Sequence, residues 1–261
     1  MRRVVFNQKG GVGKTTILCN LAAISASRGL KTLVVDLDAQ CNASQYLLSS
    51  GDLQAAAGTA DFFEDSLARG KSKRTLDEFI TPSPFENLSV MAAHPDLEEI
   101  RVKLEARQKI YKLAGALEKL EGFDAMYIDT PPALNFYSRS ALIAATNCLI
   151  PFDCDDFARQ ALYTLFDNIE EIREDHNEGL IIDGIVVNQF QTQAKLPARV
   201  ITELREEGFP LIDTQITSSV RVKESHDASV PLIHGAGSHK LTQQFVALYD
   251  ELAKAATRKK K

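Results

Sequence analysis

The sequence predicts an α/β fold in which a twisted, mostly parallel sheet carries helices on both faces. Three observations lead to this prediction. A short apolar strand at residues 4–6 turns through a glycine-rich loop into an apolar helix at 17–24. Two later apolar segments, 30–36 and 123–129, each end in an aspartate. Strand and helix patterns then alternate along the rest of the chain, which is typical of parallel sheets. We expect one domain over residues 1–261, a length that can bury a sizeable core.

The N-terminal loop has the residue types that bind phosphate. Its glycines allow backbone conformations that a Cβ atom would forbid, so successive N–H groups can point into one small volume. Lys14 adds a full positive charge there, and the Thr15 hydroxyl suits a magnesium ion that bridges two phosphates. The usual pattern G-x-x-x-x-G-K-[ST] would begin with glycine at position 8, where this chain has Gln8 followed by Lys9. The loop is therefore a deviant form of the phosphate-binding pattern.

Acidic residues follow two of the predicted strands. Asp36 ends the segment 30–36 and Asp38 comes shortly after it, whereas Asp129 ends the segment 123–129 ahead of two prolines. Carboxylates at the carboxyl ends of parallel strands lie where open α/β sheets bind ligands. A carboxylate close to metal-bound phosphate can also orient water without being a strong base. These three aspartates are therefore candidates for the ligand-binding side of the sheet.

The remaining elements are predicted from their apolar periodicity. They are a strand at 88–92, an amphipathic helix at 96–120, a strand at 148–152, a helix at 157–174, a strand at 180–188 and a helix at 238–256. Residues 51–95 are broken by glycine and proline, so we expect a variable excursion there. The chain ends in a basic tail at 257–261.

Composition limits the kind of protein and its compartment. No apolar run approaches the roughly 18 residues that a bilayer span needs, and residues 1–16 leave no room for a secretory signal, so we expect a cytoplasmic protein without integral membrane association. The four cysteines have no C-x-x-C spacing, which predicts neither a zinc site nor a disulfide framework. A formal net charge of −5 leaves room for a local basic face.

Four segments carry a resemblance to a known family. Residues 9–16, Lys-Gly-Gly-Val-Gly-Lys-Thr-Thr, resemble the phosphate loop of the ParA/MinD group of ATPases, and Gln8 is more similar to ParA than to MinD. Asp-Leu-Asp-Ala-Gln-Cys-Asn at 36–42 is similar to the family's D-x-D-P-Q-G-N, and Asp-Thr-Pro-Pro at 129–132 matches its D-T-P-P. Residues 216–225 are similar to I-P-R-N-V-R-L-x-E-A but carry Thr217 and Ser218 in place of proline and arginine.

The resemblance implies a P-loop NTPase fold, with ATP and Mg²⁺ as cofactors. It implies a homodimer closed over two ATP molecules, in which Lys9 reaches the partner's nucleotide and takes part in catalysis with Lys14. Asp38 would position the attacking water, and Asn188 would bind the adenine edge. Thr15, Asp36 and Asp129 would form the magnesium site. The implied ATP contacts are Lys9, Gly10, Gly11, Val12, Gly13, Lys14, Thr15, Thr16 and Asn188.

The family further implies a protein that positions or segregates a plasmid, a chromosome or a protein assembly. A ParB-like protein or cargo adaptor would stimulate an otherwise slow hydrolysis, and the dimer would bind nucleoid DNA without sequence preference. Basic residues in the corresponding region would contact DNA phosphates, where several weak contacts add up to salt-dependent affinity. They are Lys195, Arg199, Arg221 and Lys223.

The sequence leaves other functions open. One is a nucleotide switch that localises a signalling or chemotaxis assembly through protein contacts alone, without DNA. Another is a MinD-like division regulator at the membrane, which Gln8 and the basic tail disfavour. A metabolic enzyme of related fold, such as a dethiobiotin synthetase, would need a substrate pocket that no motif here identifies. The nitrogenase iron protein shares the deviant loop, but residues 129–136 lack its cluster cysteine.

Overall fold

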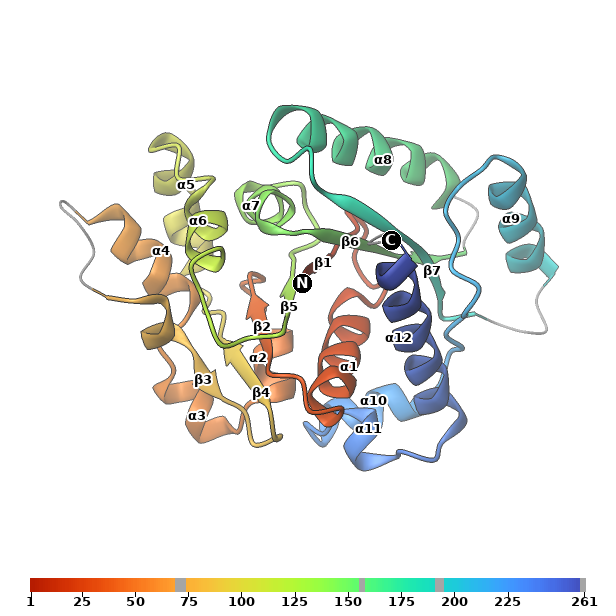
Figure 1. Ribbon diagram of the computed structural model, residues 1–261, viewed down its shortest axis with the longest axis horizontal. Coiled ribbons are helices and arrows are strands. Elements are labelled where there is room, and N and C mark those ends of the chain that lie inside the picture. The colour runs from red at the N-terminus through yellow and green to blue at the C-terminus, as the bar shows by residue number, and fades with distance from the viewer. Residues whose placement is uncertain (69–73, 155–157, 191–194, 259–261) are drawn as a thin grey trace.

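A computed structural model describes residues 1–68, 74–154, 158–190 and 195–258 (Figure 1). Its strands form one seven-stranded sheet in the order β3-β4-β2-β5-β1-β6-β7, parallel throughout except for β3. The strands are β1 Arg2–Val5, β2 Thr32–Asp36, β3 Thr81–Pro82, β4 Leu88–Met91, β5 Ala125–Asp129, β6 Asn147–Asp153 and β7 Ile181–Asn188. The predicted single-domain α/β fold with a mostly parallel sheet is confirmed.

Helices cover both faces of this sheet. Figure 1 shows α1 and α12 on one side, and α7 and α8 on the other. The helices are α1 Lys14–Ser27, α2 Asn42–Leu47, α3 Ser50–Ala55, α4 Thr59–Leu67, α5 Leu97–Ala106, α6 Lys112–Leu117, α7 Phe136–Ala144, α8 Ala158–Asp175, α9 Lys195–Glu206, α10 Val220–Asp227, α11 Leu232–Gly235 and α12 Lys240–Arg258, with a 3₁₀ turn η1 at Leu76–Phe79. Within the described ranges, no helix combines the length and the apolar character of a membrane span.

The two helical layers bury opposite faces of the same strands. Successive strand residues point to opposite sides, so Val4 joins the core under α7 and α8 whereas Val5 joins the core under α1 and α12. Val34 and Val35 of β2 divide between the two cores in the same way. Because both faces are covered, the central strands consist of continuous apolar residues, which is why the sequence shows no polar alternation there.

The helix predicted over residues 96–120 is wrong in one respect, because the structure ends α5 at Ala106 and starts α6 at Lys112. Gln108 has a φ of 51°, the left-handed conformation that closes many helices. Lys109 N donates to Leu104 O at 3.1 Å and Gln108 N to Glu105 O at 3.0 Å, which is the Schellman arrangement. Glycine is the usual residue at this position, so a glutamine there does not predict the end of a helix.

Residues 51–95 contribute to the sheet as well as to its surface. Within them, β4 pairs in parallel with β2 and β3 pairs antiparallel to β4. Helix α4, the turn η1 and all of α3 except its first residue also lie within the segment. Part of the segment is therefore integral to the fold.

Candidate nucleotide-binding site

The phosphate loop connects the end of β1 to α1 at the centre of the sheet. Gly11 and Gly13 have φ values of 76° and 87°, in the region where side chains with a Cβ are strained. A Cβ at Gly13 would also lie 2.2 Å from Nδ2 of Asn188. Glycine is therefore required at position 13 both by the backbone conformation and by the neighbouring strand end.

Lys14 lies inside the loop rather than on its surface. Its side chain is buried, and Nζ donates to the backbone oxygen of Lys9 at 3.1 Å. Burial lowers the pKa of Lys14, whereas the charges of Asp129 and Asp38 act in the opposite direction. Asn7 fixes the entry to the loop, because its Oδ1 accepts from the backbone N–H of Lys9 at 2.9 Å. The ammonium is thus held at the centre of the loop, with two carboxylates near enough to favour its charged form.

The two strand-end aspartates lie side by side, because Asp36 of β2 and Asp129 of β5 are paired in the sheet register. Burial raises the pKa of Asp36 to about 6 and the pKa of Asp129 to about 8, and the negative charge of Asp36 adds to the second shift. Thr15 Oγ1 donates to Asp129 Oδ2 at 2.7 Å. Among the described atoms, Asp129 Oδ1 is buried without a hydrogen-bond partner.

These features fit a divalent cation. An unpaired buried carboxylate oxygen is costly, and a cation beside it would restore the ionised form that burial disfavours. Hydroxyl and carboxylate oxygens are the ligands that Mg²⁺ prefers, and Thr15 and Asp129 supply one of each. Asp36 differs, because Ser44 N, Ser44 Oγ and Asp38 N already donate to its two oxygens. Asp36 therefore shapes the turn that carries Asp38.

Asp38 lies in that turn, between β2 and α2. Its Oδ1 accepts from Gln40 N at 3.0 Å, and its backbone oxygen accepts from Cys41 N at 2.8 Å. Cys41 has a φ of 58°, at the position where the similar family pattern has glycine. The cysteine at this position therefore affects the backbone conformation, whereas Asp38 keeps its hydrogen bond from Gln40 N.

Replacing Cys41 by glycine is expected to leave the protein at least as stable as the native chain. A left-handed residue with a Cβ costs about 1 kcal/mol, and glycine removes that cost while giving up the burial of a small thiol and its contact with Ala39 O. We expect a melting temperature that stays equal or rises by a few degrees, measured by differential scanning calorimetry. Gly13→Cys is the reverse control and should lower it, since Asn188 leaves no space there. A clear loss of stability in Cys41→Gly would contradict this account.

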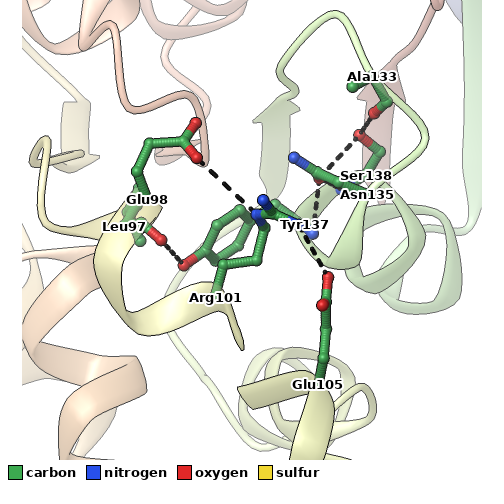
Figure 2. Close-up of polar contacts among 8 residues, drawn as sticks. All are labelled: Leu97, Glu98, Arg101, Glu105, Ala133, Asn135, Tyr137 and Ser138. Carbon is green, nitrogen blue, oxygen red and sulfur yellow. Dashed lines mark hydrogen bonds and ion pairs between the residues drawn. The ribbon is translucent and has the colours of Figure 1, made fainter. Parts of the chain in front are cut away.

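The segment after β5 is anchored where α7 begins. Figure 2 shows Asn135 accepting hydrogen bonds from Tyr137 N and Ser138 N at the start of α7, while the Ser138 hydroxyl donates to Ala133 O. The Tyr137 hydroxyl donates to Leu97 O at the start of α5 (Figure 2). The start of α7, which follows this segment, is therefore held against α5.

The end of β7 supports the phosphate loop from the other side. Asn188 Nδ2 donates to Val12 O at 2.8 Å, and Gln189 Nε2 donates to Gly11 O at 2.7 Å. Sequence reasoning assigned Asn188 to adenine and missed this support. The structure uses one amide hydrogen of Asn188 on the loop and leaves the adenine role as a prediction.

Sequence reasoning also missed a contact between α10 and α1. Thr16 Oγ1 lies 3.0 Å from Nε2 of His226, and these residues are 210 positions apart. No local pattern relates such distant residues. The contact nevertheless joins the first turn of α1, which belongs to the phosphate loop, to a helix in the last fifth of the chain.

The proposed DNA-contacting residues lie on two separate helices, α9 and α10 (Figure 1). Arg199 Nε lies 3.3 Å from Glu203 Oε1, and Arg221 Nη1 lies 2.9 Å from Glu224 Oε2, each on its own helix. Lys223 is exposed on α10, whereas Lys195 begins α9 with a side chain outside the described residues. The tail residues 259–261 also lie outside them. Arg199, Arg221 and Lys223 are therefore exposed charges on two separate helices.

The sheet order and the phosphate loop together define the class: a P-loop nucleotide-binding protein of the α/β type. A family model described as "AAA domain" matches residues 3–182. The chain is 33% identical over 260 residues to the chromosome partitioning protein ParA of Myxococcus xanthus, covering 98% of this chain and 88% of that protein. The chain belongs to the ParA family of P-loop ATPases, and the resemblance seen in its motifs is confirmed.

A second relative agrees with this assignment, and a solved structure shares the fold. The chromosome-partitioning ATPase Soj of Treponema pallidum is 33% identical over 254 residues, covering 94% of this chain and 96% of that protein. Among solved structures, cobyrinic acid a,c-diamide synthase of Mycobacterium smegmatis with bound ATP analogue and magnesium superposes with a TM-score of 0.80 at 23% identity, covering 96% of this chain and 93% of that one. The structural match shows a shared fold.

Proposed function

We propose that this protein is a ParA-like ATPase that binds ATP with Mg²⁺ and hydrolyses it to ADP and phosphate. The observation that carries the proposal is the convergence of Lys14, Thr15 and Asp129 around one loop of glycine-rich backbone. A cation, a hydroxyl and an unpaired carboxylate oxygen at that place match the charges of a magnesium-bound triphosphate. The relatives named as partitioning proteins support the same function.

Each residue of the site then has a task. The loop amides and the Lys14 ammonium bind phosphate oxygens. Thr15 and Asp129 would hold the magnesium ion. Asp36 supports the turn beside this site by accepting from Asp38 N. Bound magnesium supplies neutralisation of the charge on the phosphates. Asp38 orients the attacking water from its turn beside Asp36, a task that needs position more than basicity. Asn188 keeps one amide hydrogen and its oxygen for the adenine edge.

The cycle that we propose depends on a dimer. Two copies close over two ATP molecules, and Lys9 of each reaches the nucleotide of the other. The dimer binds nucleoid DNA in the cytoplasm, and a ParB-like protein or cargo adaptor stimulates hydrolysis and releases it. A plasmid, a chromosome or a protein assembly is the cargo. The partitioning ATPases of Myxococcus and Treponema support this reading, since the chain covers nearly all of their length.

Light scattering coupled to gel filtration tests the proposal. The native chain, 28.8 kDa as a monomer, should elute as a dimer with ATP and Mg²⁺ and as a monomer with ADP. Lys9→Ala should bind ATP, yet it should neither dimerise nor hydrolyse. A native chain that binds and turns over ATP as a monomer would overturn the dimer, and one that binds no ATP would overturn the proposal as a whole.

Replacing Arg221 by glutamate is expected to weaken DNA binding. The change reverses one charge on the exposed face of α10 and removes the ion pair with Glu224. A protein that neutralises one phosphate fewer shows a slope of log K against log salt that is shallower by about 1. The measurement is fluorescence anisotropy of a random-sequence duplex, with ATP, over a series of salt concentrations.

Arg173→Glu is the matched control for that experiment. Arg173 forms the same kind of ion pair three residues apart, with Glu170, on α8. It should leave both the affinity and the salt slope as they are in the native chain. If Arg221→Glu and Arg173→Glu showed the same affinity and the same salt slope, α10 would not be part of the DNA-binding surface.

A further inference from the structure

His226 lies on the inward side of α10, against the first turn of α1. Its Nε2 is 3.0 Å from the hydroxyl of Thr16. Thr16 directly follows Thr15 of the candidate magnesium site. The imidazole ring stacks on the Tyr46 ring with 4.0 Å between centroids and 15° between planes. The ring therefore has a fixed plane and points one nitrogen at Thr16.

Neighbouring contacts hold this part of α10 and α11 against α1 and α2. The Tyr46 hydroxyl bonds Ser225 Oγ, which itself donates to Val230 O at 2.6 Å. Asn20 of α1 donates to Thr16 O at 2.9 Å and accepts from Leu232 N at 3.0 Å. Backbone and side chains thus set the separation between α10 and the phosphate loop, and the His226 contact lies within this frame.

The direction of the hydrogen bond between Thr16 and His226 depends on what else the hydroxyl meets. A hydroxyl has one hydrogen to donate and can accept at the same time, whereas a phosphate oxygen only accepts. Burial lowers the pKa of His226, so near pH 7 its ring is neutral, with one donor nitrogen and one acceptor nitrogen. Without nucleotide, either nitrogen can carry the ring hydrogen. With a phosphate oxygen beside Thr16, the hydroxyl hydrogen points to the phosphate and Nε2 of His226 has to donate.

We propose that His226 is a positioning residue for the Thr16 hydroxyl, and that bound nucleotide fixes its Nε2–H tautomer and so fastens α10 to the phosphate loop. This inference rests on the proposed function, because it requires a phosphate group at Thr16. The outward face of the same helix carries Arg221 and Lys223. Occupancy of the nucleotide site is thereby linked, through one side chain, to the helix whose charges face solvent.

Nitrogen NMR of the histidine rings tests the tautomer directly. The protein is labelled with ¹⁵N-histidine, and His226→Gln assigns its signals among those of the five histidines. With ADP and Mg²⁺ bound, we expect the Nε2–H form of His226. The Nδ1–H form in the bound state would overturn the inference, since the ring would then present an acceptor to a hydroxyl that has already donated.

Three variants separate positioning from simple packing. His226→Ala should weaken binding of fluorescent ADP about fivefold, the worth of one hydrogen bond, and should lose nucleotide-dependent protection of the α10 amides in hydrogen exchange. His226→Gln keeps a donor at the same reach and should restore both. His234 is the matched control: it stacks on Phe85 with 4.7 Å between centroids, and burial also lowers its pKa. His234→Ala should leave affinity and α10 protection unchanged.

The outcomes distinguish this inference from the proposed function. If the native chain binds no nucleotide, both fail. If it binds nucleotide and the alanine variants of His226 and His234 behave alike, only the positioning role fails. A glutamine variant as weak as the alanine variant, with both folded by calorimetry, would likewise overturn the role of the donor nitrogen.

Discussion

Replacing Lys14 by alanine is expected to abolish ATP binding. The change removes a full positive charge from the interior of the phosphate loop, where it is held by the backbone oxygen of Lys9. Hydrogen bonds from a charged donor contribute up to about 3 kcal/mol each, so affinity should fall by at least about a hundredfold. The measurement is isothermal titration calorimetry with ATP and Mg²⁺.

Two controls show that such a loss comes from the site. Because burial lowers the pKa of Lys14, its charge is held at a cost in the folded protein. The ligand-free variant should therefore melt no lower than the native chain. Lys31 is exposed just before β2, at the amino ends of the strands and away from the phosphate loop, and its replacement by alanine should leave the affinity unchanged. Tight ATP binding by Lys14→Ala would remove the loop from the proposed site.

Replacing Asp38 by alanine is expected to leave ATP bound and to stop its hydrolysis. Among the hydrogen bonds of the described residues, the Asp38 carboxylate accepts one within its own turn and makes none to the phosphate loop. Binding should therefore persist, whereas loss of the group that orients water should slow phosphate release by at least about a hundredfold. The protein should then remain dimeric in ATP for hours, as followed by gel filtration beside a phosphate-release assay.

Asp38→Asn separates the charge from the shape of the turn. The amide oxygen can still accept from Gln40 N, so the turn should be kept while the carboxylate is lost. We expect the asparagine and alanine variants to behave alike in hydrolysis. A monomeric Asp38→Ala protein in ATP, or one with normal turnover, would exclude the assigned role.

The fold and the centre of the site could be predicted because their signals are local. Strand, glycines, Lys14 and Thr15 are consecutive, and Asp36 and Asp129 each follow a run of apolar residues. A parallel sheet brings such strand ends to one edge whatever the order of the strands. The direct pairing of the two aspartates is a finding of the structure, because it requires β2 and β5 to be neighbours in the sheet, and the motif positions do not fix the order of the strands.

Other features could not be predicted, for identifiable reasons. The end of α5 depends on the left-handed conformation of Gln108. Glutamine rarely adopts that conformation, so the sequence does not indicate a helix end there. The contact of Thr16 with His226 depends on how α10 packs, which no short pattern encodes. Charge could be counted from the sequence, but the ion pair that Arg221 makes with Glu224 requires the helix and its rotamers.

The support that the phosphate loop receives from the far end of the chain has a consequence during synthesis. A nascent chain that has emerged only to residue 182, where the family match ends, carries every residue of the loop but neither Asn188 nor His226. Its loop lacks the amide and the imidazole that hold it in the finished protein. The phosphate loop therefore gains its full set of contacts only after α10 has been synthesised, because Thr16 and His226 are 210 positions apart.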